Sequence, residues 1–421
     1  MNNFFVSHGE PNYFSWMRTA LGDFAKFAFA FFSFFYSIFL PASADGISVV
    51  RSFVVAMSSP PISIRPNSIV PLQDRGYLVS GSRGEVAWAV KLDANGKRSW
   101  EYIKSAETGV SAARVPTYYS ATELPDQTLI LCGDMTNTPP HYRAALVTHL
   151  THNGVALSSD TIVPTGEVSW GIANLRQSVD FDGGAVLLGY YSDSQRMPGR
   201  VRYYYWLVFL DSNGRITRKV DIPSSLSYIS QVSQLVVLAN DQLAFTGSTS
   251  DFEGSEIIVI SRTGVVISHK ILAGYFTLSS PIQRGGAPVL FGRPSKSALY
   301  TATLLSHIGA PLNTSRYGRK ISVQSTRIFN APDGSLFALG YCDNWDGLKG
   351  CFQHLGADLS VESSLDFSGT SASDSGSVGA IALTLYQGKF VAARQTFKKS
   401  LLGSIESSGI AVDLLDLTAK K

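Results

Sequence analysis

The sequence predicts an all-β fold, a seven-bladed β-propeller with four antiparallel strands in each blade. Three observations support this prediction. An apolar strand that ends in glycine recurs about every 50 residues, a spacing typical of propeller blades. A tight turn follows each copy 15 to 25 residues later. After residue 45, no stretch keeps a helical period of apolar residues over about a dozen positions.

The glycine-bounded strand is the first repeated feature. A turn precedes each copy, apolar residues follow, and glycine closes it, as in RGYLVSG and QTLILCG. Because short apolar runs bounded by turn residues are typical of buried strands, each copy is expected to form one strand of a sheet. The copies end at Gly81, Gly133, Gly189, Gly247, Gly292 and Gly340, with a degenerate last copy at Ala393.

The tight turn is the second repeated feature. Each turn begins with Leu or Ile at the end of an apolar strand, and glycine stands at the fifth position except in the sixth copy, which has Leu359. Asn-Gly pairs accept positive φ at both residues, so we expect two-residue hairpin turns at pairs such as Asn95-Gly96. The turns start at Leu92, Leu150, Leu210, Ile260, Leu305, Leu355 and Ile405.

The first repeat shows how four strands fit into one unit. We expect them at residues 68–72, 77–81, 86–92 and 97–103. In the third strand Trp88 and Val90 alternate with smaller residues, the period of two that strands require. Copies of such a sheet bury both faces when they stack around an axis. The rival fold is a large β-sandwich or two smaller all-β domains, and the regular phasing argues against it.

Two segments outside the regular repeats are candidates for the strand that closes the ring. Residues 47–57 form an extra strand before the first complete repeat, and residues 410–417 form a strand at the tail. Either segment would lock the ring by pairing within the last blade, and the sequence does not choose between them.

The N-terminus has the pattern of an export signal. Arg18 and Lys26 supply positive charge, an apolar run covers residues 27–40, and the small residues before Asp45 predict cleavage after Ala44. The run is shorter than a membrane-spanning helix, so an uncleaved anchor is the weaker alternative. We therefore expect a signal peptide at 1–44, a single propeller domain at 45–421, and a periplasmic or secreted protein. Translation starts at either Met1 or Met17.

Export would place the three cysteines in an oxidising compartment, where disulfides persist. Cys342 and Cys351 flank a turn-rich loop, so we expect a disulfide across a hairpin. Cys132 lies within an apolar run and is expected to be a buried free thiol.

Composition and motifs narrow the function classes. The chain has 421 residues, 45% hydrophobic and 16% charged, so it can bury a core, and its formal charge of +3 gives no reason to propose nucleic acid as a partner. We find no catalytic motif, no metal-ligand set and no cofactor fingerprint. His149 and His152 are expected on a strand end and its turn, not on one face. Whether the protein is an enzyme stays open, although the pattern leans away from catalysis.

The first repeat, GYLVSGSRGEVAWAVKLDANGKRSW, resembles the repeat of exported bacterial β-propellers. Those repeats have a glycine-bounded strand, a tryptophan-bearing strand, then Leu-Asp-x-Asn-Gly and an aromatic residue. The third repeat matches well and the other repeats match more weakly. The resemblance as a whole spans residues 66 to 417. It implies the fold and the compartment, but no active site, because propellers serve many functions.

Unequal connections suggest where a partner binds. The intervals from Gly133 to Gly154 and from Gly189 to Gly214 are the longest, and their extra residues fall between the second and third strands. Neighbouring blades would bring these connections together as an aromatic and cationic surface. Tyr and Arg are favoured at binding sites. The predicted binding residues are Tyr142, Arg143, Arg196, Arg200, Arg202 and Tyr203, with Trp345 as a possible extension.

From these features we expect an extracytoplasmic propeller that binds a protein or glycan of the cell envelope through its longer-loop face, as a scaffold, inhibitor or immunity-type module. The long connections equally fit ordinary loops with solvated arginines. The alternative function is a secreted hydrolase or lyase that acts on a polysaccharide at the central mouth. No stable membrane span is expected after signal cleavage.

Overall fold

The structure is a computed structural model. The residues it describes all lie in one compact unit, Ser43–Lys421. They are residues 47–58, 63–105, 115–136, 143–164, 172–193, 202–226, 229, 231–238, 241–249, 254–281, 288–294, 300–305, 311–318, 323–331, 334–344, 347–356, 359–366, 381–386, 389–399 and 405–417. The predicted signal peptide and both candidate start residues lie outside this part of the chain. Within the described residues, no helix has the length and apolar character that crossing a membrane requires.

Three four-stranded antiparallel sheets follow one another in the first half of the unit. Sheet I consists of β2 (Ile64–Pro71), β3 (Tyr77–Arg83), β4 (Val86–Leu92) and β5 (Arg98–Lys104). Sheet II consists of β6 (Pro116–Glu123), β7 (Leu129–Thr136), β8 (Arg143–Leu150) and β9 (Ala156–Ile162). Sheet III consists of β10 (Ala173–Phe181), β11 (Gly184–Asp193), β12 (Arg202–Leu210) and β13 (Ile216–Pro223). The four strands expected in the first repeat are therefore present, and the third has the predicted bounds.

The remaining strands form three further sheets. An eight-stranded sheet contains β14 (Gln231–Val232), β15 (Val236–Val237), β16 (Leu243–Ser248), β17 (Gly254–Ile260), β18 (Val266–Leu278), β20 (Val289–Pro294), β21 (Tyr300–Leu305) and β22 (Pro311–Gly318). A five-stranded sheet contains β19 (Ser280–Pro281), β23 (Val323–Asn330), β24 (Leu336–Asn344), β25 (Gly347–Leu355) and β26 (Val361–Asp366). The closing sheet contains β27 (Ile381–Tyr386), β28 (Lys389–Lys399), β29 (Ile405–Leu417) and β1 (Ile47–Ser58).

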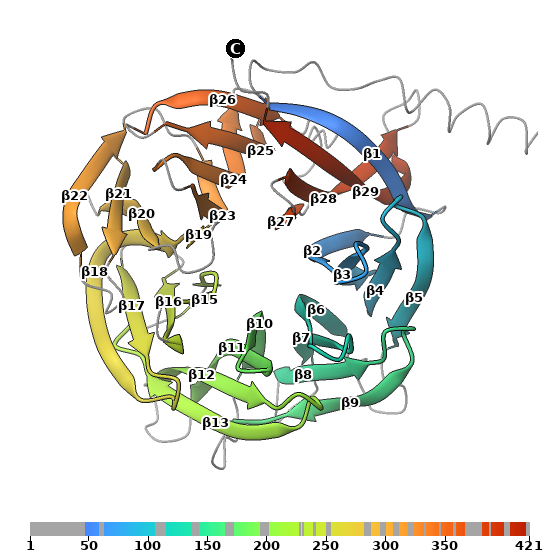
Figure 1. Ribbon diagram of the computed structural model, residues 1–421, viewed down its shortest axis with the longest axis horizontal. Helices are drawn as coiled ribbons and strands as arrows, with labels where there is room; N and C mark the ends of the chain where they lie inside the picture. The colour runs from blue at the N-terminus through green and yellow to red at the C-terminus, as the bar shows by residue number, and fades with distance from the viewer. Residues whose placement is uncertain are drawn as a thin grey trace, which may run out of the picture. The chain divides into compact units, whose positions relative to one another are not determined.

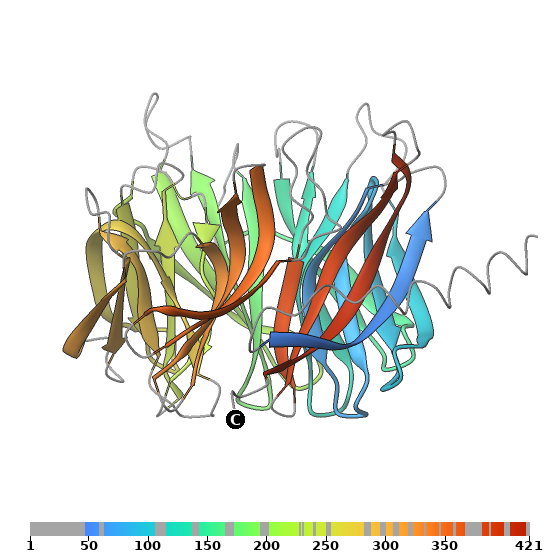
Figure 2. The same cartoon turned by 90° about the horizontal axis from the view of Figure 1, so that it is seen from above.

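The sheets are arranged around a common centre, so the protein is an all-β propeller, as predicted (Figure 1). In each of sheets I to III the first strand lies innermost and the fourth outermost (Figure 1). Figure 2 shows the same sheets from the side. Both candidate segments take part in ring closure, since β1 from the start of the unit pairs antiparallel with β29 near its end.

The predicted number of seven blades is not confirmed, because the described strands form six sheets. The difference arises at β18. Its first part pairs with β17 from Val266 to Ala273, and its second part pairs with β20 from Gly274 to Leu278. One uninterrupted strand therefore joins two groups of strands that the repeat pattern separates.

The repeated glycines occupy like positions, as the sequence predicts. Each lies on a strand that pairs with the innermost strand of its group, for example Gly81 opposite Pro66 and Gly133 opposite Tyr118. A Cβ atom at Gly133 would lie 1.8 Å from the carbonyl oxygen of Thr117. The innermost backbone approaches Gly81, Gly189 and Gly292 as closely, so only glycine fits there. At Gly247 the Tyr205 side chain takes the space instead.

The turns differ from the prediction of two-residue hairpins. In the first copy the Gly96 amide donates to the Asp93 carbonyl at 2.9 Å, and the Asp93 amide donates to the Lys97 carbonyl at 2.8 Å. Gly96 has φ of 78°, whereas Asn95 is not among the described residues with positive φ. The connection is thus a four-residue turn whose last residue is left-handed, which widens the hairpin. Leu359 adopts φ of 62° at the same place in the sixth copy.

The left-handed glycine also packs against the preceding sheet. A Cβ atom at Gly154 of sheet II would lie 2.6 Å from the indole of Trp100 in sheet I. At Gly96 the neighbour is the ring of Phe53, which belongs to β1 in the closing sheet. The same kind of glycine–aromatic contact therefore joins sheet II to sheet I and sheet I to the closing sheet.

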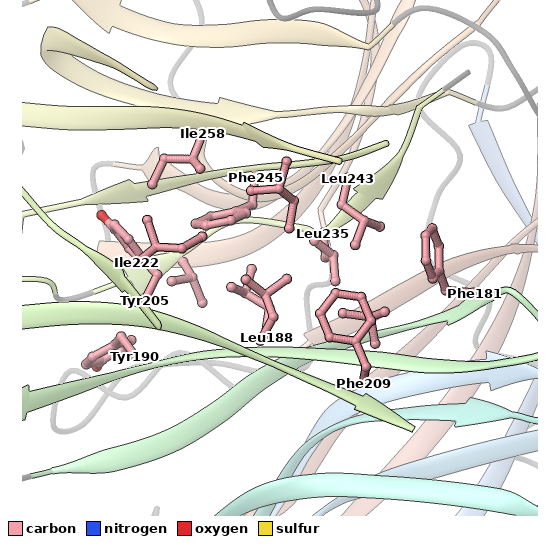
Figure 3. Packing of buried hydrophobic residues seen from close by; sticks show 14 of the residues in the cluster. Phe181, Leu188, Tyr190, Tyr205, Phe209, Ile222, Leu235, Leu243, Phe245 and Ile258 are labelled. Carbon is pink, nitrogen blue, oxygen red and sulfur yellow. The ribbon is translucent and has the colours of Figure 1, made fainter. Parts of the chain in front are cut away.

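Apolar clusters fill the spaces between consecutive sheets. Trp88, Val90 and Leu92 face the closing sheet, while Ala87 and Ala89 face sheet II, so both faces of sheet I are buried. Between sheet III and the eight-stranded sheet, aromatic residues interlock, as Tyr205 and Phe245 do with ring centroids 5.2 Å apart (Figure 3). This burial on both faces is the main force that holds the sheets in a ring.

Candidate functional site

The candidate site lies where the β7–β8 and β11–β12 connections leave sheets II and III. Of the predicted binding residues, Arg202 is exposed and Tyr203 is half-buried, and they lie opposite Asp193 and Ser192 at the end of β11. Tyr142, Arg196, Arg200 and Trp345 lie outside the described residues. Arg143 begins β8, but its side chain also lies outside the described part. The meeting of the two connections remains a prediction.

The innermost strands share a β-bulge near this end. In β2, β6 and β10 one residue is skipped in the pairing directly after the residue opposite the repeated glycine. A bulge redirects a side chain and is common next to functional sites. The three residues so displayed are polar or aromatic: Asn67, Tyr119 and Arg176.

Arg176 is the centre of a polar network between sheets II and III. Its guanidinium carbon lies 3.6 Å from the centroid of the Tyr119 ring. The Tyr119 hydroxyl donates to the Asp134 carboxylate at 3.3 Å, and this carboxylate is almost fully buried. Burial acts against the charge of Arg176, but Tyr119, Tyr190 and Asp134 raise its pKa above the ordinary value. Arg176 therefore stays cationic, with an anionic neighbour.

A second set of contacts fixes the backbone around this network. Asn67 donates through Nδ2 to the carbonyl of Tyr118 at 2.7 Å, which joins sheet I to sheet II. The Trp206 indole donates to the carbonyl of Asn174 at 2.9 Å. The Asn174 side chain is fully buried, and its Nδ2 has no hydrogen-bond acceptor among the described residues. Such an unsatisfied donor is uncommon in a folded protein.

Another polar cluster, centred on Glu256 of β17, lies where the eight-stranded sheet meets the segment after β13 of sheet III. This residue pairs with Gly247, the place that Trp88 and Trp206 take in sheets I and III. Its buried carboxylate accepts from the Ser225 amide at 2.6 Å and the Ser224 hydroxyl at 2.8 Å, and it lies 3.2 Å from Nε2 of His269. Glu256 thus anchors the segment that follows β13.

Two carboxyl groups with raised pKa lie away from the candidate site. Burial raises the pKa of Glu123 and of Asp221. Glu123 ends β6, at the other end of that strand from Tyr119, and Asp221 lies on the outermost strand β13. Within the same described part, no three potential ligands come together to hold a metal ion.

Arg202 and Tyr203 are the predicted binding residues whose side chains the structure describes, and their binding role remains a prediction. Sequence reasoning did not point to Tyr119, Asp134, Arg176 and Glu256. The repeat gave the position of each glycine, and the bulge lies directly opposite. The residue type at the bulge was the available signal, since Asn67, Tyr119 and Arg176 stand at like offsets before their glycines. Glu256 had a similar signal, because it replaces a tryptophan in the repeat.

The cysteines divide between confirmed and untested predictions. Cys132 is buried and free, as expected, and burial raises its pKa to about 12. Cys342 lies opposite Lys349, and Cys351 lies opposite Gly340, so the two cysteines are diagonal neighbours on β24 and β25. The disulfide itself remains a prediction.

The fold places the protein in the class of β-propellers, and solved structures of low identity resemble it. The β-propeller domain of the Trilobed protease from Pyrococcus furiosus, described as having an open velcro topology, is 11% identical, with a TM-score of 0.45 and coverage of 85% of this chain and 94% of that chain. The PQQ-bound aldose sugar dehydrogenase from Streptomyces coelicolor is 14% identical, with a TM-score of 0.39 and coverage of 72% and 93%. Kuenenia stuttgartiensis hydrazine synthase is 10% identical, with a TM-score of 0.42 and coverage of 66% and 75%.

No protein-family model matches the chain, and no curated protein matches it. Function must therefore be argued from the site itself.

Proposed function

We propose that this protein is an extracytoplasmic binding module rather than an enzyme, and that it engages a protein or glycan of the cell envelope through the end of sheets II and III. The observation that carries the proposal is the Arg176 network, because it fixes polar and aromatic groups where the long connections leave. Arg202 and Tyr203 extend the same end of sheet III toward solvent. A scaffold, inhibitor or immunity role fits such a surface.

Charge reversal tests the surface. The triple variant Arg196→Glu, Arg200→Glu, Arg202→Glu should abolish capture of a partner from cell-envelope extract by the immobilised protein. The matched control reverses Lys97, Arg215 and Lys270, which are exposed cations on turns and outer strands away from this end. Unchanged capture by the first variant, with an unchanged unfolding midpoint, would exclude this surface as the binding site.

The compartment is part of the proposal. The charged and apolar pattern of residues 18–44 and the resemblance to exported propeller repeats both support export. N-terminal sequencing of the protein isolated from an exporting host should begin at Asp45. Its intact mass without reductant should be lower by the two hydrogens of the Cys342–Cys351 disulfide. A sequence that retains residues 27–40 would support the membrane anchor instead.

We also infer that the eight-stranded sheet represents two blades, which gives seven in the ring. An apolar cluster containing Val236, Ile257 and Leu290 packs between its two groups of strands, as other clusters pack between separate sheets. The change of partner within β18 supports the same division. An experimental structure with β18 broken near Gly274 would agree with this count.

A further inference from the structure

The Arg176 network has the chemistry of a site for a neutral, hydroxyl-rich ligand. We infer that the ligand is a neutral glycan, an inference that rests on the proposed binding function of this end of the molecule. The reasons are the charge balance of the network, its hydroxyl-pairing groups and the aromatic side chains at the same end of the sheets.

Charge balance argues against an anionic ligand. Arg176 would attract a carboxylate or phosphate if it were alone, because the guanidinium fork suits these groups. Asp134 already supplies a negative charge beside it and helps to raise its pKa. A second anion would meet the buried Asp134 carboxylate, and like charges in a low-dielectric interior repel strongly. The network therefore favours a ligand without charge.

The polar groups are of the kinds that hydroxyl groups pair with. A hydroxyl both donates and accepts, so one ligand hydroxyl can satisfy a carboxylate and a guanidinium together. Tyr119 is half-buried rather than enclosed, and its hydroxyl already lies 3.3 Å from Asp134.

Aromatic rings complete the arrangement. Tyr191 and Tyr204 stack with centroids 4.9 Å apart and planes at 8° near the end of β11 and β12. Tyr204 is half-buried on the face toward sheet II, so part of its side chain meets solvent. Rings of this kind offer apolar surface to the C–H faces of sugar rings while their hydroxyls stay hydrated. Polar and aromatic groups thus occur together at one end of two neighbouring sheets.

Adjacent tyrosines provide a matched pair of variants. Tyr119 faces the network, whereas Tyr118 is fully buried toward sheet I and its hydroxyl bonds with Thr148 at 2.7 Å. Tyr119→Phe keeps the ring beneath Arg176 but removes the hydroxyl that orients Asp134. Tyr118→Phe removes the same atom one residue away and leaves the network intact. Unfolding midpoints of both variants show that each still folds.

The probes are soluble neutral oligosaccharides, namely hexamers of glucose in α and β linkage and of N-acetylglucosamine, with oligogalacturonate as the acidic comparison. Titration calorimetry of the full-length protein should show binding of a neutral oligomer, weakened about tenfold by Tyr119→Phe and unchanged by Tyr118→Phe. Preference for the acidic oligomer, or equal loss in both variants, would overturn the glycan inference.

Two outcomes separate this inference from the proposed function. If no oligosaccharide binds, but wild type captures a protein partner that the triple charge-reversal variant does not capture, the glycan inference is wrong and the binding function stands. If neither oligosaccharide nor captured protein depends on this end of the molecule, both fail.

Discussion

Two equivalent junctions between sheets are held by charged groups in different environments. At the junction of sheets I and II, Lys91 Nζ lies 2.6 Å from the Asp74 carboxylate and 2.5 Å from Nε2 of His152, and the lysine is 4% exposed. At the junction of sheet III with the eight-stranded sheet, Arg262 pairs with Asp182, and both side chains are about half exposed. In each case the turn between third and fourth strands meets the first turn of the preceding sheet.

The comparison shows that ion pairs at equivalent positions in the fold differ in burial, and burial governs how much each is expected to stabilise. Water screens the Arg262 pair, and exposed pairs contribute little. The buried Lys91 also receives support from its surroundings, since Trp100 donates to the His152 carbonyl at 2.9 Å and the Gln73 amide donates to Glu123 at 2.7 Å. We therefore expect the first junction to be the more sensitive to substitution.

The largest effect is expected from the glycines of the two turns. Gly154→Ala places a methyl group against the rigid indole of Trp100 at a residue with φ of 80°, and it should lower the free energy of unfolding by about 3 kcal/mol. Gly264→Ala has a similar φ but meets chiefly one methyl group of Val220, so about 1.5 kcal/mol is expected. Urea unfolding measures both, and equal losses would contradict the ranking.

Removal of the buried amine should have the next effect. Lys91→Met keeps the length of the side chain but leaves Asp74 and His152 without their shared donor. A loss of about 2 kcal/mol is expected, as for hydrogen bonds to charged groups. Arg98→Met, at an exposed cation of the same sheet, is the control and should change the urea midpoint little. A neutral or stabilising Lys91→Met would show that desolvation of the amine outweighs its contacts.

Acid should weaken the first junction through Asp74. Burial acts to raise the pKa of this carboxyl, but the hydrogen bond and charge of Lys91 hold it below the ordinary value. An acid with a lowered pKa stabilises the folded state when ionised, and this contribution is lost as pH falls through the folded pKa. Asp74→Asn should therefore lower stability at neutral pH, and the difference from wild type should vanish in strong acid. A pH-independent difference would contradict this assignment.

The smallest effect is expected at the exposed pair. Arg262→Gln removes the partner of Asp182, whose pKa the Arg262 hydrogen bond and charge lower. Because both groups are open to solvent, the thermal midpoint should remain unchanged, particularly in high salt. A marked loss of stability that salt abolishes would show that this pair contributes to the junction despite its exposure.

The sequence predicted the repeated glycines and turns, because each is required by the local backbone of most repeats. Most of the glycines recur because the innermost backbone leaves no room for a side chain, and the turns recur because one residue must be left-handed. The turn type was wrong since Asn-Gly fits both a two-residue hairpin and a longer turn whose last residue is glycine. The sheet count also differed, because nothing in the residues around Gly274 marks the continuity of β18.

The candidate site was harder to predict because it depends on contacts between repeats. Tyr119 and Arg176 are far apart in sequence, and the packing of sheet III against sheet II brings them together. The period-two pattern marks Lys91 as the polar member of an alternating strand, yet neighbouring sheet II covers it almost completely. Alternation predicts faces, but it does not show which faces another sheet will cover.

The pairing of β1 with β29 has a consequence for the order of assembly. These strands come from opposite ends of the unit, Ile47–Ser58 and Ile405–Leu417, so neither can complete its sheet until the whole intervening chain is present. Joining them has the largest loop-closure entropy in the molecule, which makes it a late step. Until then, β29 presents an unpaired edge to other nascent chains, and the pairing with β1 is the step that removes this edge.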